Sequence, residues 1–287
     1  YIFALQLGAA YKISDNWSVY AGVRGNYSSN NYLGTIKAVA DIPAVGMNGV
    51  DVMAVNLDMD QSGIAFTPII GVDYKVGNFN FAAKYEFRAK TTVENDTKTM
   101  EVTANQALDA IKPGMSATVQ GTANAALGGY LGGFADGNKL RSDAPAILSL
   151  AGSWQIIDRL QVMAGWNYYF DKDAKVESLM GGDNMKKLSR NTLEYLFGAE
   201  FKVTEKFLLS AGIQFSNFGI NDKYTSDLAF TNDSFMTGVG GKYSVTDKVD
   251  INFGYCYANY APDNNALTQT RYERKTHNAT IGVDFRF

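Results

Sequence analysis

Hydrophobic and polar residues alternate along most of this chain. In residues 79–88, apolar or aromatic side chains occupy every second position, and small or polar side chains fill the positions between them. Residues 249–258 repeat this arrangement. Because residues i and i+2 of a strand share a face, each run predicts a strand with one apolar face and one small, polar face.

The length of these runs distinguishes two kinds of β-protein. A soluble β-sandwich also has a period of two, but its strands average about 5–6 residues. The runs here are about 10–17 residues long, and a strand needs about 9–11 residues to cross a bilayer at a tilt. The pattern therefore favours a transmembrane barrel over a sandwich or a lipocalin.

A short motif recurs five times and marks tight turns. It contains a small residue, two variable residues, an aromatic, a polar and an aliphatic residue, then a short polar turn and a new apolar residue. The copies occupy residues 8–17, 71–79, 151–160, 198–207 and 240–249. Polar turn residues between alternating runs indicate β-hairpins. We therefore expect a tight hairpin at each copy.

The hairpins and the runs between them predict eleven strands. These are residues 3–13, 17–30, 63–76, 79–94, 144–156, 160–172, 191–203, 207–217, 233–245, 249–260 and 271–287. Every short turn follows an odd-numbered strand, and every long connection follows an even-numbered one. Outer-membrane barrels place short turns on the periplasmic side and long loops outside. The fold class expected is all-β, a transmembrane antiparallel up-and-down β-barrel with short helices in its long extracellular loops.

Two features of the chain ends lead to further expectations. Bacterial single-chain barrels have an even number of strands. Eleven strands with the first beginning outside therefore predict an N-terminally incomplete barrel. The last run, residues 279–287, alternates and ends on the aromatic Phe287. This ending resembles the signal that the outer-membrane assembly machinery reads, so we expect that machinery to be a partner.

The aromatic residues beside the tight turns form a set of their own. Amphipathic rings prefer the membrane interface, so rings at one level predict a girdle that faces lipid on the periplasmic side. The set comprises Tyr11, Trp17, Tyr74, Phe79, Trp154, Phe201, Phe207 and Tyr243.

Composition argues against several other classes of protein. The net charge of −3 does not favour nucleic-acid binding. The single Cys256 excludes a disulfide framework, and with only one histidine, His277, a multi-histidine metal site is excluded as well. The alternation directs His277 outward, away from any nucleophile. We therefore predict no enzyme activity, no cofactor and no metal.

Three parts of the chain carry a resemblance to a known family: residues 7–19 (LGAAYKISDNWSV), residues 70–74 (IGVDY) leading to 84–88 (KYEFR), and the order of elements from 192 to 287. In these parts the chain resembles the FadL-type outer-membrane transporters of long-chain fatty acids and other hydrophobic compounds. Members have fourteen strands and an N-terminal plug, and this chain is similar to strands four to fourteen.

The resemblance implies a location and a function. It implies a monomer in the Gram-negative outer membrane, with residues 1–287 forming a single barrel domain. It also implies passive uptake of a hydrophobic small molecule, foremost a long-chain fatty acid. The alternative is a general porin or a structural barrel without a hydrophobic ligand. The plug, the first strands and the kinked strand that forms the family's lateral exit are expected to be missing.

Residues 31–62 and 95–142 are expected to be long extracellular loops. The second should contain a short helix with Thr103 as its cap, Ala104, Leu108 and Ile111 on one face, and an end at Pro113-Gly114. Loops this apolar either pack on each other and cap the barrel or also form a groove for an apolar ligand. The resemblance implies the second role. The groove candidates are Leu33, Ile36, Val52, Met53, Val55, Leu108, Ile111, Leu127, Tyr130, Leu131 and Phe134.

Inward-facing cations are the remaining candidates for ligand contact. Arg24, Lys84 and Arg88 could bind a carboxylate head group. Carboxylates such as Glu86 and Glu194 are predicted to face inward as well. Salt bridges that stabilise the barrel are therefore the other interpretation of these charges.

Overall fold

The computed structural model describes residues 1–286 except 43–46, 221–223, 225–231 and 265–269. In the described residues, thirteen strands form one sheet. Its strands are β1 (Ile2–Lys12), β2 (Trp17–Ile42), β3 (Met47–Val76), β4 (Phe79–Glu86), β5 (Thr92–Ala104), β6 (Lys139–Arg141), β7 (Ile147–Ile157), β8 (Leu160–Tyr169), β9 (Leu193–Lys202), β10 (Phe207–Asn217), β11 (Ser234–Thr246), β12 (Val249–Asn264) and β13 (Arg271–Phe285). The helices are α1 (Met115–Leu131) and the short 3-10 turns η2 (Gln106–Ala110), η3 (Gly132–Phe134), η4 (Asp171–Asp173) and η5 (Asn184–Lys187).

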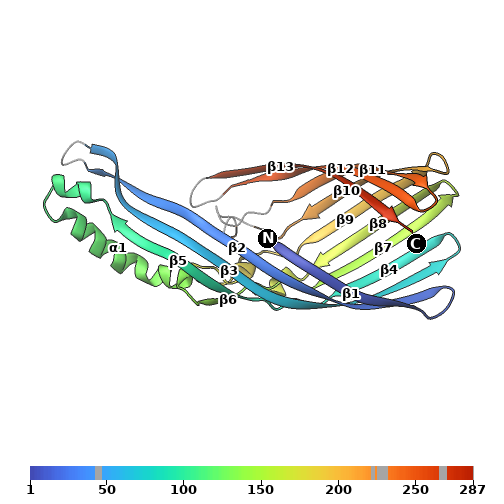
Figure 1. The fold of residues 1–287 in the computed structure, drawn as a ribbon, viewed down its shortest axis with the longest axis horizontal. Coiled ribbons are helices and arrows are strands. Elements are labelled where there is room, and N and C mark those ends of the chain that lie inside the picture. The colour runs from blue at the N-terminus through green and yellow to red at the C-terminus, as the bar shows by residue number, and fades with distance from the viewer. Residues whose placement is uncertain (43–46, 221–223, 225–231, 265–269, 287) are drawn as a thin grey trace.

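The eleven predicted strands correspond to β1–β4 and β7–β13, and their up-and-down order is confirmed. Along the order β1-β2-β3-β4-β7-β8-β9-β10-β11-β12-β13, each strand pairs with the next. The pairing is antiparallel at every step. The sheet is strongly curved, and β1 and β13 are its two edges in the described residues (Figure 1).

The predicted girdle beside the tight turns is present. Trp17 lies opposite Tyr74 in the strand register, and Phe79 lies opposite Trp154. The ring centroids of these two pairs are 4.4 and 5.6 Å apart. Tyr11 is 71% exposed, and the other members of the girdle are exposed or half-buried on the outer face. Phe287 lies outside the described residues.

A second aromatic girdle, which the sequence did not reveal to us, lies near the opposite ends of the strands. It includes Tyr85, Phe87, Trp166, Tyr168, Phe170, Phe215, Phe235, Tyr255 and Tyr257, many in direct ring contact. The girdles are separated by roughly eight residues along a strand. At about 3.3 Å per residue and a tilt of about 40°, this is roughly 20 Å. Two aromatic bands at this spacing match the two interfaces of a bilayer.

Residues 31–62 were predicted to be a loop, and this was wrong. β2 and β3 continue through them as one long hairpin, with registered pairs out to Ile42 and Met47. The segment contains several Val residues together with Ile36 and Ile42, and β-branched residues favour strands. Four of the apolar residues that suggested a packed loop, Met53, Val55, Leu57 and Met59, occupy alternate positions of β3.

The predicted strand 79–94 was also wrong at its end. β4 ends at Glu86, and a connection without regular strand structure leads to β5, which begins at Thr92. β5 then pairs with the extension of β3, from Met53↔Ala104 to Ser62↔Glu94. A Cβ at Gly63 would lie 2.5 Å from the carbonyl oxygen of Thr92. Glycine at this position therefore allows β5 to come close to β3.

The helix in 95–142 lies later than predicted. Thr103 belongs to β5, and Asn105 caps η2 by accepting a hydrogen bond from the Ala107 amide at 3.0 Å. Pro113-Gly114 does not end the helical segment but joins η2 to α1. Gly114 has a φ of 78°, a left-handed conformation that favours glycine. The Pro-Gly pair forms a turn before a helix, whereas the prediction used it as a helix stop.

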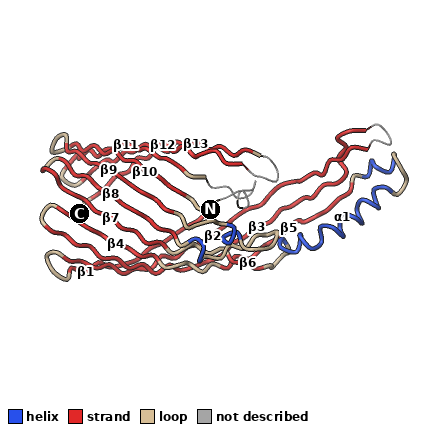
Figure 2. Tube along the Cα trace, turned by 180° about the vertical axis from the view of Figure 1, so that it is seen from behind, coloured by secondary structure: helices blue, strands red, loops and turns tan. Residues whose placement is uncertain are grey.

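One unit projects from the rest of the sheet, and we call it the arm. It consists of residues 29–62 of β2 and β3, together with residues 92–135. It extends beyond the ends of the other strands, and α1 runs alongside its strands (Figures 1 and 2). One face of its three-stranded sheet is polar. Ion pairs on that face join Lys37 to Asp51 and Lys98 to Asp60, both at 2.6 Å.

Candidate functional site

The opposite face of the arm is apolar and is covered by the helical segment. Met59, Val93 and Ala104 are almost fully buried there, as are Leu108 of η2 and Phe134 of η3. The strand register places Met53 and Val55 on the same face of β3 as Met59. This face forms the interior of the arm.

Polar contacts fix the helical segment on this face. The Gln120 side chain of α1 donates to the Val102 carbonyl at 2.6 Å and accepts from the Ala104 amide at 2.8 Å. The Thr97 hydroxyl donates to the carbonyl of Phe134 at 2.6 Å. The Gln120 side chain therefore satisfies backbone groups of β5 at the edge that is not paired with β3.

The predicted groove residues fall into three groups by burial. Leu108 and Phe134 are buried, whereas Leu33 and Ile36 are 76% and 74% exposed. The half-buried group comprises Val52, Met53, Val55, Ile111, Leu127 and Leu131. Tyr130 lies in α1, and its side chain is outside what the structure describes. Leu33 lies on the polar face by register, so the arrangement separates it from the others.

Much of the apolar surface of the two predicted loops is therefore used in mutual packing. An open margin remains on β2, where Ile36 lies opposite Val55 but is far more exposed. We define this margin by Ile36, Met53 and Val55, three of the predicted groove residues that the packing of the arm leaves exposed or half-buried.

The inward-facing cations are already paired. Glu86, which is 5% exposed, accepts Arg24 Nη1 at 2.8 Å through one oxygen and Lys84 Nζ at 2.7 Å through the other. Arg24 also donates from Nε to Gln6 at 3.0 Å. The geometry favours the interpretation of these charges as salt bridges: Arg24–Glu86 joins β2 to β4, and Lys84–Glu86 lies within β4.

A second carboxylate on the inner wall gathers uncharged groups. Glu194 of β9 accepts hydrogen bonds from Asn167 at 3.0 Å and Tyr169 at 2.8 Å. Gln214 and Ser216 each donate to it at 3.1 Å from β10. These contacts cross-link β8, β9 and β10 near their outer ends.

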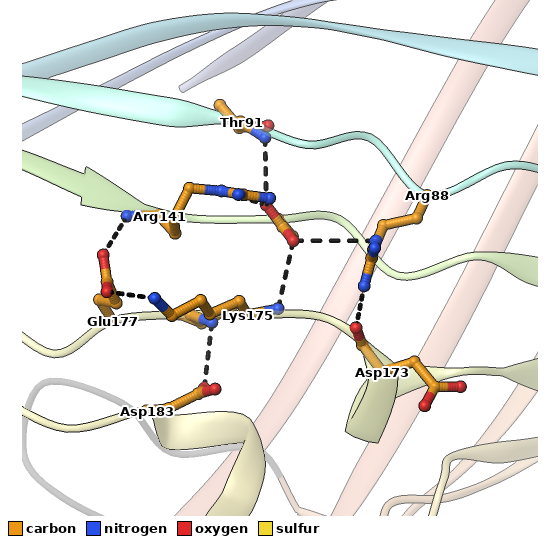
Figure 3. Close-up of polar contacts among 9 residues, drawn as sticks. Arg88, Thr91, Arg141, Asp173, Lys175, Glu177 and Asp183 are labelled. Atoms are coloured by element: carbon orange, nitrogen blue, oxygen red, sulfur yellow. Dashed lines mark hydrogen bonds and ion pairs between the residues drawn. The ribbon is translucent and has the colours of Figure 1, made fainter.

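Arg88 does not lie on the inner wall with the other two cations. It lies beyond the end of β4 and belongs to a polar group that we call the Asp143 cluster: Arg88, Thr91, Arg141, Asp143, Lys175 and Glu177 (Figure 3). The Asp143 side chain is 0% exposed and accepts Arg141 Nη2 at 2.6 Å. It also accepts the backbone amides of Thr91 and Lys175 at 3.2 and 3.3 Å.

The Asp143 cluster joins three segments at the outer ends of the strands. Arg88 Nε lies 3.9 Å from Asp143, and its Nη1 donates to the carbonyl of Asp173. Glu177 accepts the Arg141 amide at 2.7 Å and pairs with Lys175 at 2.6 Å. The cluster holds the chain at the point where it leaves the wall to form the arm. Sequence analysis missed it, because its polar residues lie in irregular segments without a periodic signal.

The inner wall between β8 and β13 is lined by small residues. Gly198, Gly212 and Gly238 lie side by side across three strands. Met163 and Met236 flank them in a hollow of about 600 Å³. Cys256, predicted to face inward, is on this wall.

In the part of the chain that the structure describes, no group of three or more His, Cys, Asp or Glu side chains could hold a metal ion. Among these residues, no helix has the length and apolarity to cross a membrane.

A family model described as "Outer membrane protein transport protein (OMPP1/FadL/TodX)" matches residues 2–286. The chain belongs to this family. The predicted resemblance and the location in the Gram-negative outer membrane are confirmed. The family is one of transporters and channels for hydrophobic compounds rather than of enzymes.

Several solved structures share this fold. A FadL homologue from Pseudomonas aeruginosa aligns with a TM-score of 0.62 and 18% identity over 98% of this chain. The Pseudomonas putida toluene transporter TodX gives a TM-score of 0.62 at 14% identity over 100% of this chain. The Ralstonia pickettii toluene transporter TbuX gives 0.57 at 15% over 100%.

The match covers only part of these relatives. The chain spans 65% of the FadL homologue, 69% of TodX and 67% of TbuX. No curated protein matches the sequence. At these identities the solved structures establish the fold of this FadL-family chain.

In the arm of this FadL-family chain, Asp109 stabilises the first turn of α1. This contact predicts that the stability of the turn decreases in acid. Its carboxylate accepts the Ser116 amide at 2.9 Å and the Ser116 hydroxyl at 2.6 Å. Both hydrogen bonds hold the pKa of Asp109 below its ordinary value, and the bond from the Ser116 hydroxyl contributes most. A depressed pKa in the folded state means that the support is complete above the ordinary pKa and is lost as pH falls through the lower, folded value.

We therefore expect the Ser116 amide to lose protection from hydrogen exchange only below about pH 4. The protection factor, which removes the intrinsic pH dependence of exchange, is the quantity to measure. Asp109→Asn should abolish the acid transition, because the amide side chain does not titrate in this range. An identical transition in this variant would contradict the assignment.

Proposed function

We propose that this protein carries hydrophobic small molecules, foremost long-chain fatty acids, passively across the outer membrane. The observation that supports this most is the open apolar margin of the arm, formed by Ile36, Met53 and Val55. An apolar chain that lies along this margin would extend the packed interior of the arm. Family membership supports the same class of cargo.

Burial energy predicts which cargo binds best at the margin. Each methylene removed from water contributes about 0.8 kcal/mol, so roughly sixteen carbons contribute about 13 kcal/mol. Association costs at least about 4 kcal/mol, which leaves an affinity near the micromolar range. A ring of about seven carbons would gain less than half as much and bind far more weakly. The margin therefore suits long chains better than small rings.

A second cargo class, uncharged hydrocarbons, is supported by a separate observation. Arg24 and Lys84 both pair with Glu86, and Arg88 is held by Asp143 and Asp173. A fatty-acid carboxylate would have to displace one of these partners, whereas a neutral molecule would not. Two similar structures are titled toluene transporters.

We infer the rest of the arrangement from the same family. The arm, which contains the segments 31–62 and 95–142, would lie on the extracellular side of a single barrel domain. The protein would act as a monomer without a cofactor, and the assembly machinery would recognise its C-terminal strand. These features are proposals.

The test is binding and uptake of radiolabelled palmitate by the full-length protein carrying Met53→Asp. We expect at least a tenfold loss of affinity, because a charge at the margin opposes burial of the chain. Val39→Asp is the matched control, since Val39 is 57% exposed and lies on the polar face. Unchanged palmitate binding in Met53→Asp, together with free passage of small sugars, would support the porin alternative instead.

Glu86→Gln separates the two cargo classes. It should raise affinity for palmitate but leave affinity for toluene unchanged, because it releases Arg24 and Lys84 from their partner. If the inner cations never meet the cargo, neither affinity changes. That outcome favours uncharged cargo.

A further inference from the structure

The outer half of β13 carries a row of basic residues on its lipid-facing side. Arg271, Lys275 and His277 share the face that also holds Ala279 and Ile281, because they are spaced by even numbers of residues. All three basic residues are exposed. Ile281, further along the strand, is 80% exposed and lies opposite Phe253, between the two aromatic girdles.

His277 is held in a defined orientation. Its Nδ1 lies 2.7 Å from the Tyr255 hydroxyl, and its ring centroid lies 4.9 Å from that of Tyr257. Within the described residues, Nε2 has no hydrogen-bond partner. The imidazole ring therefore lies against Tyr255 and Tyr257 and leaves Nε2 available for a hydrogen bond.

The level of this row in the membrane follows from the outer girdle. Tyr255 and Tyr257 belong to the girdle, and His277 lies opposite Tyr257 in the register. Lys275 lies opposite Asn259, which in turn lies opposite Phe235. Aromatic girdles mark the level of the lipid headgroups, so Lys275 and Asn259 project at or just beyond that level.

The charge of the row is only partly neutralised. Arg271 pairs with Glu273 at 2.5 Å. Within the described residues, Lys275 has no carboxylate at ion-pair distance. Lysine near a membrane surface attracts anionic lipids, and phosphate oxygens accept charge-assisted hydrogen bonds.

We propose that Lys275, His277 and Asn259 bind the phosphate of an anionic lipid in the outer leaflet of the outer membrane. Lys275 supplies the charge, while His277 and Asn259 supply hydrogen bonds to the phosphate oxygens. Tyr257 provides an aromatic surface for the adjoining part of the lipid. This site faces away from the lumen and does not depend on which cargo is carried.

The test uses the full-length protein in zwitterionic detergent, titrated with lipid A in its phosphorylated and enzymatically dephosphorylated forms. We expect the phosphorylated form to bind at least tenfold more tightly. Lys275→Gln/His277→Gln should remove that preference, and Lys275→Arg/His277→Arg should retain it. The control Lys206→Gln/Lys248→Gln removes two lysine charges, no fewer than the test variant removes, at two exposed tight turns on the opposite side and should leave the preference intact.

Heat-modifiable migration in gels verifies that each variant is folded. Equal binding of both lipid forms by the wild-type protein would overturn the proposal, as would full lipid preference in the glutamine variant. Inorganic phosphate alone provides the last arm. If it stabilises the protein against heat as strongly as the phosphorylated lipid does, the site belongs to a free anion and the lipid assignment is wrong.

Discussion

Replacing Asp143 by alanine is expected to destabilise the outer end of the sheet by about 3–5 kcal/mol. The carboxylate is fully buried and is the common acceptor for Arg141 and for the amides of Thr91 and Lys175. Its removal leaves these donors without an acceptor, and an unpaired buried polar group costs about 1–3 kcal/mol. Urea unfolding, together with the rate of proteolysis within residues 139–146, measures the effect.

A matched control separates burial from charge. Glu94 pairs with Lys139 at 3.2 Å, but both side chains are more than half exposed. Such a pair contributes at most about 1 kcal/mol, so Glu94→Gln should unfold close to the wild type. Similar midpoints for Asp143→Ala and Glu94→Gln would show that the Asp143 cluster does not hold the arm to the wall.

Replacing Leu108 by aspartate is expected to detach the helical segment from the arm. Leu108 is 1% exposed, and a carboxylate at that position must either lose its charge or open the packing. We expect a local cost of about 3–5 kcal/mol, the range for a buried charge without a partner. Hydrogen exchange across residues 115–131 should rise strongly, while exchange in β7–β13 stays unchanged.

Ala117→Asp is the control for this substitution. Ala117 lies on the exposed side of the first turn of α1, where a negative charge is tolerated by the helix dipole. It should leave exchange in α1 near the wild-type level. If Leu108→Asp exchanged as slowly as Ala117→Asp, the apolar layer would not be what holds α1 in place.

The arm is the part of the fold that the sequence pattern did not predict. Alternation in residues 31–62 contained the information that these residues form strands, but their length and apolar content suggested a loop. What makes them strands is pairing, including pairing with β5 some forty residues away in sequence, as in Met59↔Thr97. Sequence patterns record which face a residue occupies but not which distant segment lies beside it.

The inner charges show the same limit. Alternation directed Arg24, Lys84 and Glu86 to one face, but it could not pair them. Arg24 and Glu86 are 62 residues apart, and β3 lies between their strands. The curvature of the sheet brings Arg24 to Glu86, so both candidate head-group ligands, Arg24 and Lys84, share Glu86 as their ion-pair partner.

The sequence by itself determined the presence and order of the eleven strands of the wall, the tight turns and the girdle beside those turns. These features depend on local rules: the period of two in a strand, the polar residues of a short turn and the preference of rings for an interface. Only the tertiary structure decided the arm, the Asp143 cluster and the pairing of the inner charges. Each depends on contacts between segments distant in the chain, whose free energy no local pattern encodes.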